Sequence, residues 1–456
     1  MKREENSQKK LKNIDISIVD IFILIIPDSQ YLKEICTSSK SFLSVINKPI
    51  LFYQLEFLER QGINKVKILA NKDYIVIKQA LDNYKGPIKY EFIELKEKLG
   101  LGLFDAIKSN LDYKNFILIE GDSILSFNLW DMIDNHIDNN NLLSLVLQQK
   151  ADANYLKKFR EKAVNIFGID LDDNNRVVYY AKQNMDDHRN ISIKKEILSH
   201  CKRMNLLFKY IDIGLYIFND SIFDILKSPK FKEKTSKLNF ESIKEDFIPY
   251  LIKQTFSKTL NMILIENYKN QLLKAKRVKI SAKLIQNSDD INSEFCYKIY
   301  DYPSYLQIIK EIQKPYEQIK PIFFQTKNNS KNYFSNFKDK IIDNLTNNKK
   351  FNEEIPELSL ISDDTYIADV IKSIEEGAKI NKSVVDKNLK IDKNSEIINC
   401  IIGLDAEIGK NCEIKNCIIG DNAKIADESK ISECIIGESY NFTNEKKIEV
   451  SEQILY

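Results

Sequence analysis

The chain has 456 residues, of which 43% are hydrophobic and 29% charged, and its formal net charge is only +2. This length allows two or three domains, each with a core of its own. A charge so close to zero argues against a global attraction to nucleic acid or to an anionic membrane, and we expect neither as a direct partner. The abundance of Lys, Asn and Ile is interpreted as a codon-composition bias without a function.

The N-terminal region predicts a polar tail at 1–13, followed by an apolar run at 16–26. Asp20 interrupts this run, which is too short to span a bilayer. A signal peptide is not expected, because no small-residue cleavage site follows the run. The seven cysteines, an odd number, favour reduced thiols. We therefore expect a cytoplasmic protein.

Residues 14–312 alternate between predicted strands and helices. Strands are expected at 16–26, 65–70, 88–95, 116–119, 142–147, 163–170, 177–181 and 210–218, and helices at 50–61, 74–83, 104–110, 243–256 (interrupted by Pro249) and 305–312. This alternation predicts an α/β domain with a mostly parallel, Rossmann-like sheet. Ligands bind at the carboxyl ends of such strands, where the loops 27–40, 96–103 and 120–123 would converge.

The rest of the chain is predicted to form three segments. Residues 313–370, which include a stretch rich in Asn, Lys and Ser, are expected to be a linker or an insertion. Residues 371–440 contain internal repeats, and 441–456 are expected to be a C-terminal tail.

The repeats share a Cys-Ile-Ile-Gly motif, in which Cys400, Cys417 and Cys434 recur at a constant interval. A degenerate turn precedes them, with Ser383 and Asp386 in place of Cys and Gly. Aliphatic residues recur at steps of six, five and six: Ile391, Ile397, Ile402, Ile408, Ile414, Ile419, Ile425, Ile431 and Ile436.

A six-residue beat fits neither a helix nor a long strand. It predicts a left-handed β-helix of hexapeptide repeats, with three short strands per coil and one aliphatic side chain turned inward from each. A run of ordinary alternating strands is the alternative. The repeated cysteines are better explained as core packing than as metal ligands.

Many hexapeptide-repeat proteins are acyltransferases with a catalytic histidine between coils. Here His136, His188 and His200 all precede the repeats, which excludes such a base. We expect the three histidines on solvated loops.

An α/β sheet followed by this solenoid resembles the sugar-1-phosphate nucleotidyltransferase family. The segments Ile46-Asn47-Lys48-Pro49-Ile50, 101–107 and Gly121-Asp122 are similar to motifs of that family. The resemblance implies a pocket for a nucleotide and a sugar phosphate. The residues that would line its remnant are Lys40, Gly102, Asp105, Gly121 and Asp122.

Several departures from the family's motifs lie in this same pocket. The phosphate-binding glycine loop is replaced by 27–31, which contains no glycine, and bulky Leu103-Phe104 stands where small residues are usual. Lys298 occupies the position of the second magnesium-binding carboxylate, where a cation would repel the ion. We therefore expect no catalysis, no metal and no cofactor, and we interpret Asp122 as a structural carboxylate.

Segments 242–254, 296–299 and 434–437 resemble the gamma subunits of eukaryotic translation initiation factor 2B. The epsilon subunits carry an additional C-terminal domain for nucleotide exchange, which we do not expect after residue 456. The resemblance implies a non-catalytic subunit that pairs with epsilon, then with beta, delta and alpha, and helps to bind initiation factor 2. Its interface would use the faces of the coils and the α/β domain. An active sugar-1-phosphate nucleotidyltransferase is the alternative.

Overall fold

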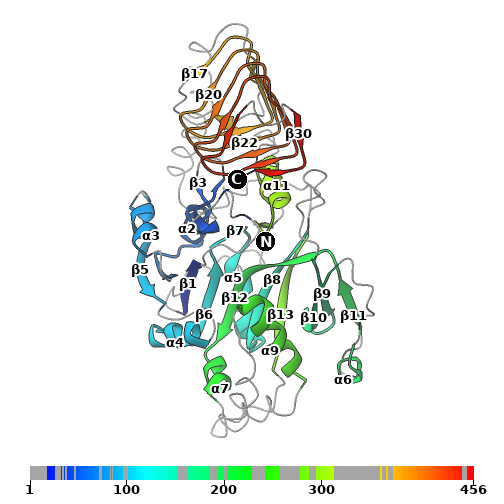
Figure 1. Ribbon diagram of the computed structural model, residues 1–456. Coiled ribbons are helices and arrows are strands. Elements are labelled where there is room, and N and C mark those ends of the chain that lie inside the picture. Colours follow the sequence, from blue (N-terminus) through cyan, green and yellow to red (C-terminus); the bar gives the residue numbers. More distant parts are fainter. Residues whose placement is uncertain are drawn as a thin grey trace, which may run out of the picture.

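The computed structural model describes residues 18–25, 32, 35, 39–45, 48–70, 74–82, 84, 86–95, 101–150, 163–184, 191, 193–199, 201, 203–227, 242–256, 278–286, 294–312, 360–361, 366–367, 373–443 and 449–455. An α/β domain lies at the bottom of Figure 1 and a stack of triangular coils at the top, with α11 (Tyr302–Ile312) between them. The predicted tail at 1–13 and the Asn-rich stretch lie outside the described residues.

A ten-stranded sheet forms the centre of the α/β domain, which confirms the predicted fold class. The strand order is β11 (Met204–Leu207), β9 (Ala163–Asp170), β10 (Arg176–Asn184), β13 (Ile280–Ile285), β8 (Leu143–Gln149), β12 (Tyr210–Asn219), β6 (Asn115–Glu120), β1 (Val19–Ile25), β4 (Lys65–Ala70) and β5 (Lys89–Glu94). The sheet is mixed. Strands β6, β1, β4 and β5 are parallel, whereas β12 runs antiparallel to both of its neighbours.

Each predicted helix is present, with shifted ends. These helices are α2 (Ile50–Arg60), α3 (Tyr74–Leu81), α4 (Leu101–Ser109), α9 (Ile248–Gln254) and α11, and the structure adds α5 (Leu129–Asp138), α6 (Lys195–Leu198) and α7 (Ser221–Lys227). The helix expected at 243–256 divides into a π-helical turn, η3 (Ile243–Phe247), and α9. Pro249 lies in the first turn of α9, where its missing N–H group would have no intrahelical partner.

Strand β1 shows how the sheet separates two hydrophobic cores. Phe22 and Leu24 face one core, and Ile21 and Ile23 face the other. Because successive side chains of a strand point to opposite faces, a continuous apolar run indicates burial on both sides. Asp20, near the start of β1, accepts a hydrogen bond from Lys67 Nζ at 2.7 Å.

His136 corrects the expectation of solvated histidines, because it lies on the inner face of α5 and is buried. Its Nδ1 atom is 2.8 Å from Ser144 Oγ. Burial lowers the pKa of His136 to about 4, so the ring is neutral at pH 7. The amphipathic spacing of α5 would have revealed the buried position. His188 and His200 lie outside the described residues.

The C-terminal coils form the predicted left-handed β-helix, built from three parallel sheets. The first contains β15 (Leu360–Ile361), β18 (Lys379–Asn381), β21 (Glu396–Ile398), β24 (Glu413–Lys415), β27 (Lys430–Ser432) and β30 (Glu449–Ser451). The second contains β16 (Tyr366–Ile367), β19 (Val384–Val385), β22 (Ile401–Ile402), β25 (Ile418–Ile419), β28 (Ile435–Ile436) and β31 (Ile454–Leu455). The third contains β17 (Ser373–Ile374), β20 (Lys390–Ile391), β23 (Glu407–Ile408), β26 (Lys424–Ile425) and β29 (Asn441–Phe442).

The interior of the β-helix follows the predicted register. All nine predicted isoleucines belong to one buried cluster, together with Cys400, Cys417 and Cys434. The backbone N–H of Cys417 donates to Cys400 Sγ at 3.4 Å, and the N–H of Cys400 donates to Ser383 Oγ at 3.1 Å. Burial raises the pKa of the Cys417 thiol well above its usual value. These thiols pack the interior and link one coil to the next.

The β-helix extends beyond both predicted boundaries, 371 and 440. Strands β15 and β16 pair with β18 and β19, so the coils begin before residue 371. Strands β29, β30 and β31 pair with the preceding coil, so part of the expected tail belongs to the β-helix. The repeat spacing did not predict the last coil, because the interval from Ile431 to its partner Val450 is longer than the interval from Ile414 to Ile431.

The asparagines at the corners of the coils correct the interpretation of composition as a codon bias alone. Asn399, Asn411 and Asn416 have φ values of 57°, 53° and 55°. Asn adopts this left-handed conformation more readily than most residues, because its short polar side chain bonds locally. Asn399 Nδ2 also donates to Asn416 Oδ1 in the next coil. The spacing of Asn along the repeats was therefore a structural signal.

One outer face of the β-helix is apolar, and it packs against the α/β domain. Val384, Ile401, Ile418 and Ile435, here called the docking row, share a buried cluster with residues of α11 and α2. The first Ile of each Cys-Ile-Ile-Gly motif thus points outward and the second inward. In the part of the chain that the structure describes, no helix is long and apolar enough to cross a membrane.

Candidate functional site

The candidate site is built where β6 ends and the chain turns into β7 (Ser123–Ser126). Glu120 is the last residue of β6, and Asp122 follows it in the turn. The buried side chain of Gln54 on α2 holds this turn, because its Nε2 donates to the carbonyl oxygens of Glu120 and Ser123 at 2.8 and 2.9 Å. Two carboxylates are therefore presented from a rigid support.

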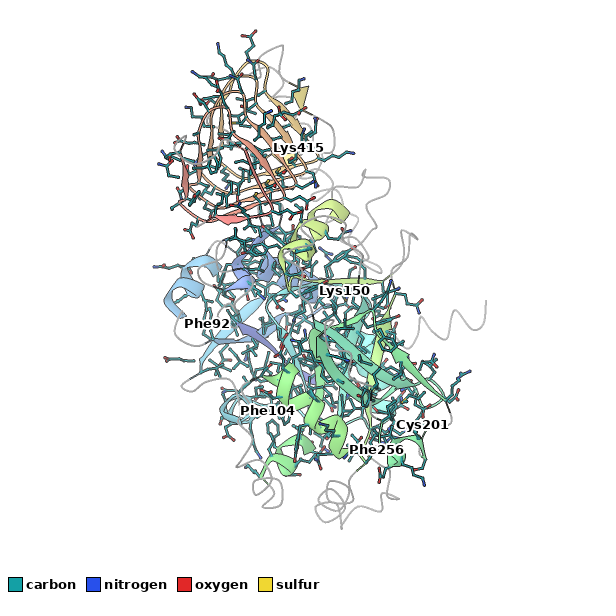
Figure 2. All side chains as sticks on the ribbon, turned by 45° about the vertical axis from the view of Figure 1, so that its right-hand side comes forward. Phe92, Phe104, Lys150, Cys201, Phe256 and Lys415 are labelled. Carbon is teal, nitrogen blue, oxygen red and sulfur yellow. The ribbon has the colours of Figure 1, made fainter. Side chains whose placement is uncertain are left out.

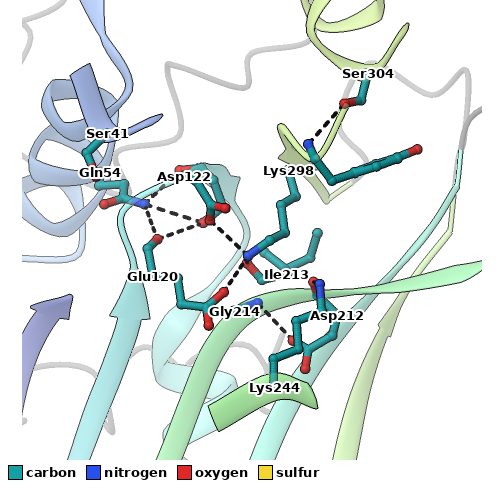
Figure 3. A network of polar contacts seen from close by, with 12 residues as sticks. Ser41, Gln54, Glu120, Asp122, Asp212, Ile213, Gly214, Lys244, Lys298 and Ser304 are labelled. Atoms are coloured by element: carbon teal, nitrogen blue, oxygen red, sulfur yellow. Dashed lines mark hydrogen bonds and ion pairs between the residues drawn. The ribbon is translucent and has the colours of Figure 1, made fainter. Parts of the chain in front are cut away.

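Lys298 lies between these carboxylates (Figure 3). It ends β14 (Phe295–Lys298), which pairs with β7 and places Lys298 opposite Ser123. Its Nζ donates to Glu120 Oε2 at 2.5 Å, to Asp122 Oδ1 at 2.8 Å and to the carbonyl oxygen of Ile213 at 3.3 Å. Three oxygen atoms thus surround one buried ammonium group, which has three protons to donate.

A bulge in β12 completes the site. The backbone N–H of Gly214 donates to Asp212 Oδ1 at 2.8 Å, and Tyr216 OH donates to Asp212 Oδ2 at 2.9 Å. Gly214 has a φ of +82°, and a Cβ atom here would lie only 2.4 Å from Glu120 Oε2. Glycine is required both by the backbone conformation and by the closeness of the Glu120–Lys298 pair.

The charges of the site balance one another. Lys244 on η3 lies 3.3 Å from the carbonyl oxygen of Asp212 (Figure 3). Burial opposes ionisation of Asp122, but the ammonium groups of Lys298, Lys40 and Lys244 outweigh it and lower the pKa of Asp122. Formally, three cations face three anions: Lys40, Lys244 and Lys298 against Glu120, Asp122 and Asp212.

The pKa values of the buried groups shift in different directions. Burial opposes the charge of Lys298, yet Asp122 and Glu120 raise its pKa, so this ammonium stays charged. Burial, helped by the neighbouring Lys298, lowers the pKa of Lys244, and burial raises the pKa of Asp212. For both Lys298 and Asp122, neighbouring opposite charges shift the pKa toward the charged form by more than burial shifts it away. This pair is therefore the electrostatic centre of the site.

Three of the five predicted pocket residues come together in this site. Asp122 pairs with Lys298, and Lys40 in the 3₁₀ turn η1 (Lys40–Phe42) is close enough to lower the pKa of Asp122. Gly121 lies under Ser41, whose Oγ would be 2.1 Å from a Cβ atom at position 121. The side chain of Ser41 therefore occupies the space beside Gly121.

The other two predicted residues, Gly102 and Asp105, lie on α4, and Asp105 is exposed there. Its charge acts on Lys108, one turn along the same helix. The neighbouring Phe104 is buried, 4.8 Å from the ring of Phe247 and 5.7 Å from that of Phe218 (ring centroids). The bulky side chain of Phe104 therefore packs in the hydrophobic core and not in a ligand pocket. The loops 27–31 and 96–100 lie outside the described residues.

Several residues of the site were not predicted from the sequence, among them Gln54, Glu120, Asp212 and Lys244. Glu120 immediately precedes the predicted Gly121-Asp122 pair, and Asp212 lies two residues before Gly214 in an apolar strand. A carboxylate within such a strand is a signal for a buried partner. No local pattern marks Gln54 or Lys244, because each reaches the site through a long-range contact.

Comparison with known proteins finds one matching family model and similar curated proteins. A family model described as the GMPPB C-terminal domain matches residues 349–452, which include the coil strands from β15 to β30. The translation initiation factor eIF2B subunit gamma of Dictyostelium discoideum is 23% identical over 316 residues, covering 61% of this chain and 70% of the relative. This chain is similar to eIF2B subunit gamma. The subunit of the same name from Schizosaccharomyces pombe is also 23% identical, over 296 residues that cover 60% of each chain.

These matches confirm the predicted resemblance to gamma subunits of eIF2B. They span about 60 to 70% of the length of the two curated relatives. The β-helix is the part that the GMPPB C-terminal domain model describes.

Proposed function

We propose that this chain is a non-catalytic, gamma-type subunit of a cytoplasmic eIF2B guanine-nucleotide exchange complex. It pairs with the epsilon subunit, joins beta, delta and alpha, and helps to bind initiation factor 2. The names of the curated relatives support the subunit type. The partners follow from the resemblance to gamma subunits.

The position of Lys298 is the observation that carries the non-catalytic role. Its Nζ contacts Glu120 and Asp122 at 2.5 and 2.8 Å, so the oxygen atoms that a magnesium ion would need already surround an ammonium group. These residues do not fit a divalent ion. Among the described residues, the balanced charges around Asp122 also leave no cationic surplus for a triphosphate. Both features support a domain that acts by being bound in an assembly.

Co-expression tests the proposed role in the complex. We expect the chain alone to be poorly soluble or to self-associate, and co-expression with an epsilon subunit to yield a soluble pair. The bound chains would be identified by mass spectrometry after tandem purification. A monodisperse chain that does not co-purify with epsilon would contradict the proposed pairing.

The alternative, an active sugar-1-phosphate nucleotidyltransferase, is tested directly. The purified chain is incubated with magnesium, a nucleoside triphosphate and a sugar 1-phosphate, and released pyrophosphate is measured. We expect none above background. Pyrophosphate release at ordinary enzymatic rates, lost in an Asp122→Asn variant, would overturn the non-catalytic assignment.

A further inference from the structure

The docking row joins the β-helix to the α/β domain through α11. Val384, Ile401, Ile418 and Ile435 are at most 6% exposed. They lie in one cluster with Tyr302, Tyr305, Leu306 and Ile308 of α11. Figure 1 shows α11 directly below the coils. Apolar contact of this kind is sensitive to a single buried charge.

The other two outer faces of the β-helix carry charged pairs. Lys415 lies 3.6 Å from Glu396 and 4.0 Å from Glu413 on one face, and Lys424 lies 3.3 Å from Glu407 on the other. Figure 2 shows Lys415 projecting from the coil stack. In the part of the β-helix that the structure describes, the docking row is therefore the apolar outer face that α11 covers.

Helix α11 is joined to Lys298 by a short, hydrogen-bonded connection. The N–H of Ile299, the next residue after Lys298, donates to the carbonyl oxygen of Asp122 at 3.1 Å. Ser304 Oγ accepts from the N–H groups of Tyr300 and Asp301, both at 3.0 Å, which fixes the start of α11. Three residues therefore separate Lys298 from the first residue of α11, and hydrogen bonds hold this connection at both ends.

Strand β14, which carries Lys298, is held by limited pairing. It forms a two-stranded sheet with β7, separate from the ten-stranded sheet. The N–H of Cys296 donates to Gln148 Oε1 at 3.0 Å, which ties the strand to β8. A short two-stranded ribbon is only marginally stable by itself. The packing of α11 is accordingly a major support for the placement of Lys298.

We propose that the β-helix, docked on α11, keeps Lys298 between Glu120 and Asp122. The docking row and the buried ion cluster are then coupled. Displacing the β-helix from α11 releases the ammonium group of Lys298 and exposes the carboxylates of Glu120 and Asp122. This coupling is a continuous chain of contacts from coil to helix to strand to ion pair. It requires no partner subunit.

Amine labelling of the whole chain, read by mass spectrometry, tests this coupling. The test variant is Ile418→Asp in the docking row, and the matched control is Lys415→Asp on the exposed face of β24. We expect Ile418→Asp to increase the labelling rate of Lys298 about tenfold or more, because local opening exposes its amine. The control variant should leave Lys298 protected.

Two internal references separate this opening from general unfolding. Lys67 is also buried and paired, with Asp20 at 2.7 Å and Asp112 at 2.8 Å, and belongs to the α/β domain. Cys417 is fully buried inside the β-helix. In Ile418→Asp, Lys67 should stay protected from the amine reagent and Cys417 from a thiol reagent.

The outcomes decide the proposal. Lys298 labelling that stays at the wild-type rate, or that rises only together with Lys67, overturns it. If Cys417 becomes reactive, Ile418→Ala replaces Ile418→Asp, because it shortens the outward side chain without burying a charge. The milder variant should still raise Lys298 labelling above that of the control, with Cys417 protected, and failure to do so also overturns the coupling.

Discussion

The β-helix and the ion cluster of the α/β domain are both buried, but they are built in opposite ways. In the interior of the β-helix, isoleucine recurs at equivalent positions of successive coils. For example, Ile397 is paired with Ile414, and Ile414 with Ile431. In the ion cluster, Gln54, Glu120, Ile213 and Lys298 come from four distant parts of the chain. A repeated interior distributes its stability over many similar contacts, whereas a buried charge depends on a few specific partners.

The largest expected effect is the loss of stability when Lys298 is removed from the ion cluster. Lys298→Met leaves Glu120 and Asp122 next to each other without their cation, and we expect a loss of about 3–5 kcal/mol in unfolding free energy. Urea unfolding measures it. Adding Glu120→Gln and Asp122→Asn should recover part of the loss. A decrease below about 1 kcal/mol would show that water already screens the pair.

The next effect tests whether the coils stack through their interior column. Ile414→Ala removes a fully buried side chain and should destabilise the β-helix by about 2–5 kcal/mol. Glu413→Ala, on the exposed side of the same strand, should change stability by no more than about 0.5 kcal/mol. Thermal unfolding of the two variants makes the comparison. Equal effects would contradict the inward register.

A pH titration distinguishes a buried neutral group from the ion cluster. His136 has a pKa of about 4 in the folded chain, against 6.5 as its ordinary value. The unfolded chain therefore binds a proton first as pH falls. The contribution of His136 is complete above pH 6.5 and is lost between pH 6.5 and about 4, by on the order of 3 kcal/mol.

In a His136→Gln variant this part of the pH dependence should disappear, although the variant is less stable at pH 7. The measurement is the free energy of unfolding in urea from pH 7 to pH 4. An unchanged slope in the variant would mean that other groups, such as the carboxylates around Lys298, account for the loss.

The smallest expected difference is between two glycines with nearly the same backbone conformation. Gly62 and Gly214 have φ values of +81° and +82°, but a Cβ atom would meet nothing within 4 Å at Gly62 and Glu120 Oε2 at 2.4 Å at Gly214. Gly62→Ala should cost about 1 kcal/mol through its backbone. Gly214→Ala should cost about 1–3 kcal/mol more, because it also displaces the ion pair. Equal losses in chemical denaturation would contradict close packing around Glu120.

Local periodicity carried most of what could be predicted about the β-helix. The step of six, five and six placed nine isoleucines in the interior, because every coil repeats the same environment. The same rule failed in the last coil, where Val450 pairs with Ile431 after a longer interval than the repeat predicts. Because adjacent residues of a strand point to opposite sides, the inward Ile419 implies that Ile418 faces outward. The periodicity did not indicate that α11 covers Ile418, because that contact joins segments far apart in the chain.

The sequence by itself determined the alternation of strands and helices in the α/β domain, the register of the regular coils and the unusual cation at Lys298, because these depend on neighbours along the chain or on residue type. Only the tertiary structure decided that Lys298 is seated between Glu120 and Asp122, that Lys244 approaches the carbonyl oxygen of Asp212 and that Asp105 lies apart on α4. These placements depend on contacts between segments far apart in sequence. Long-range packing selects such partners, and no local pattern encodes them.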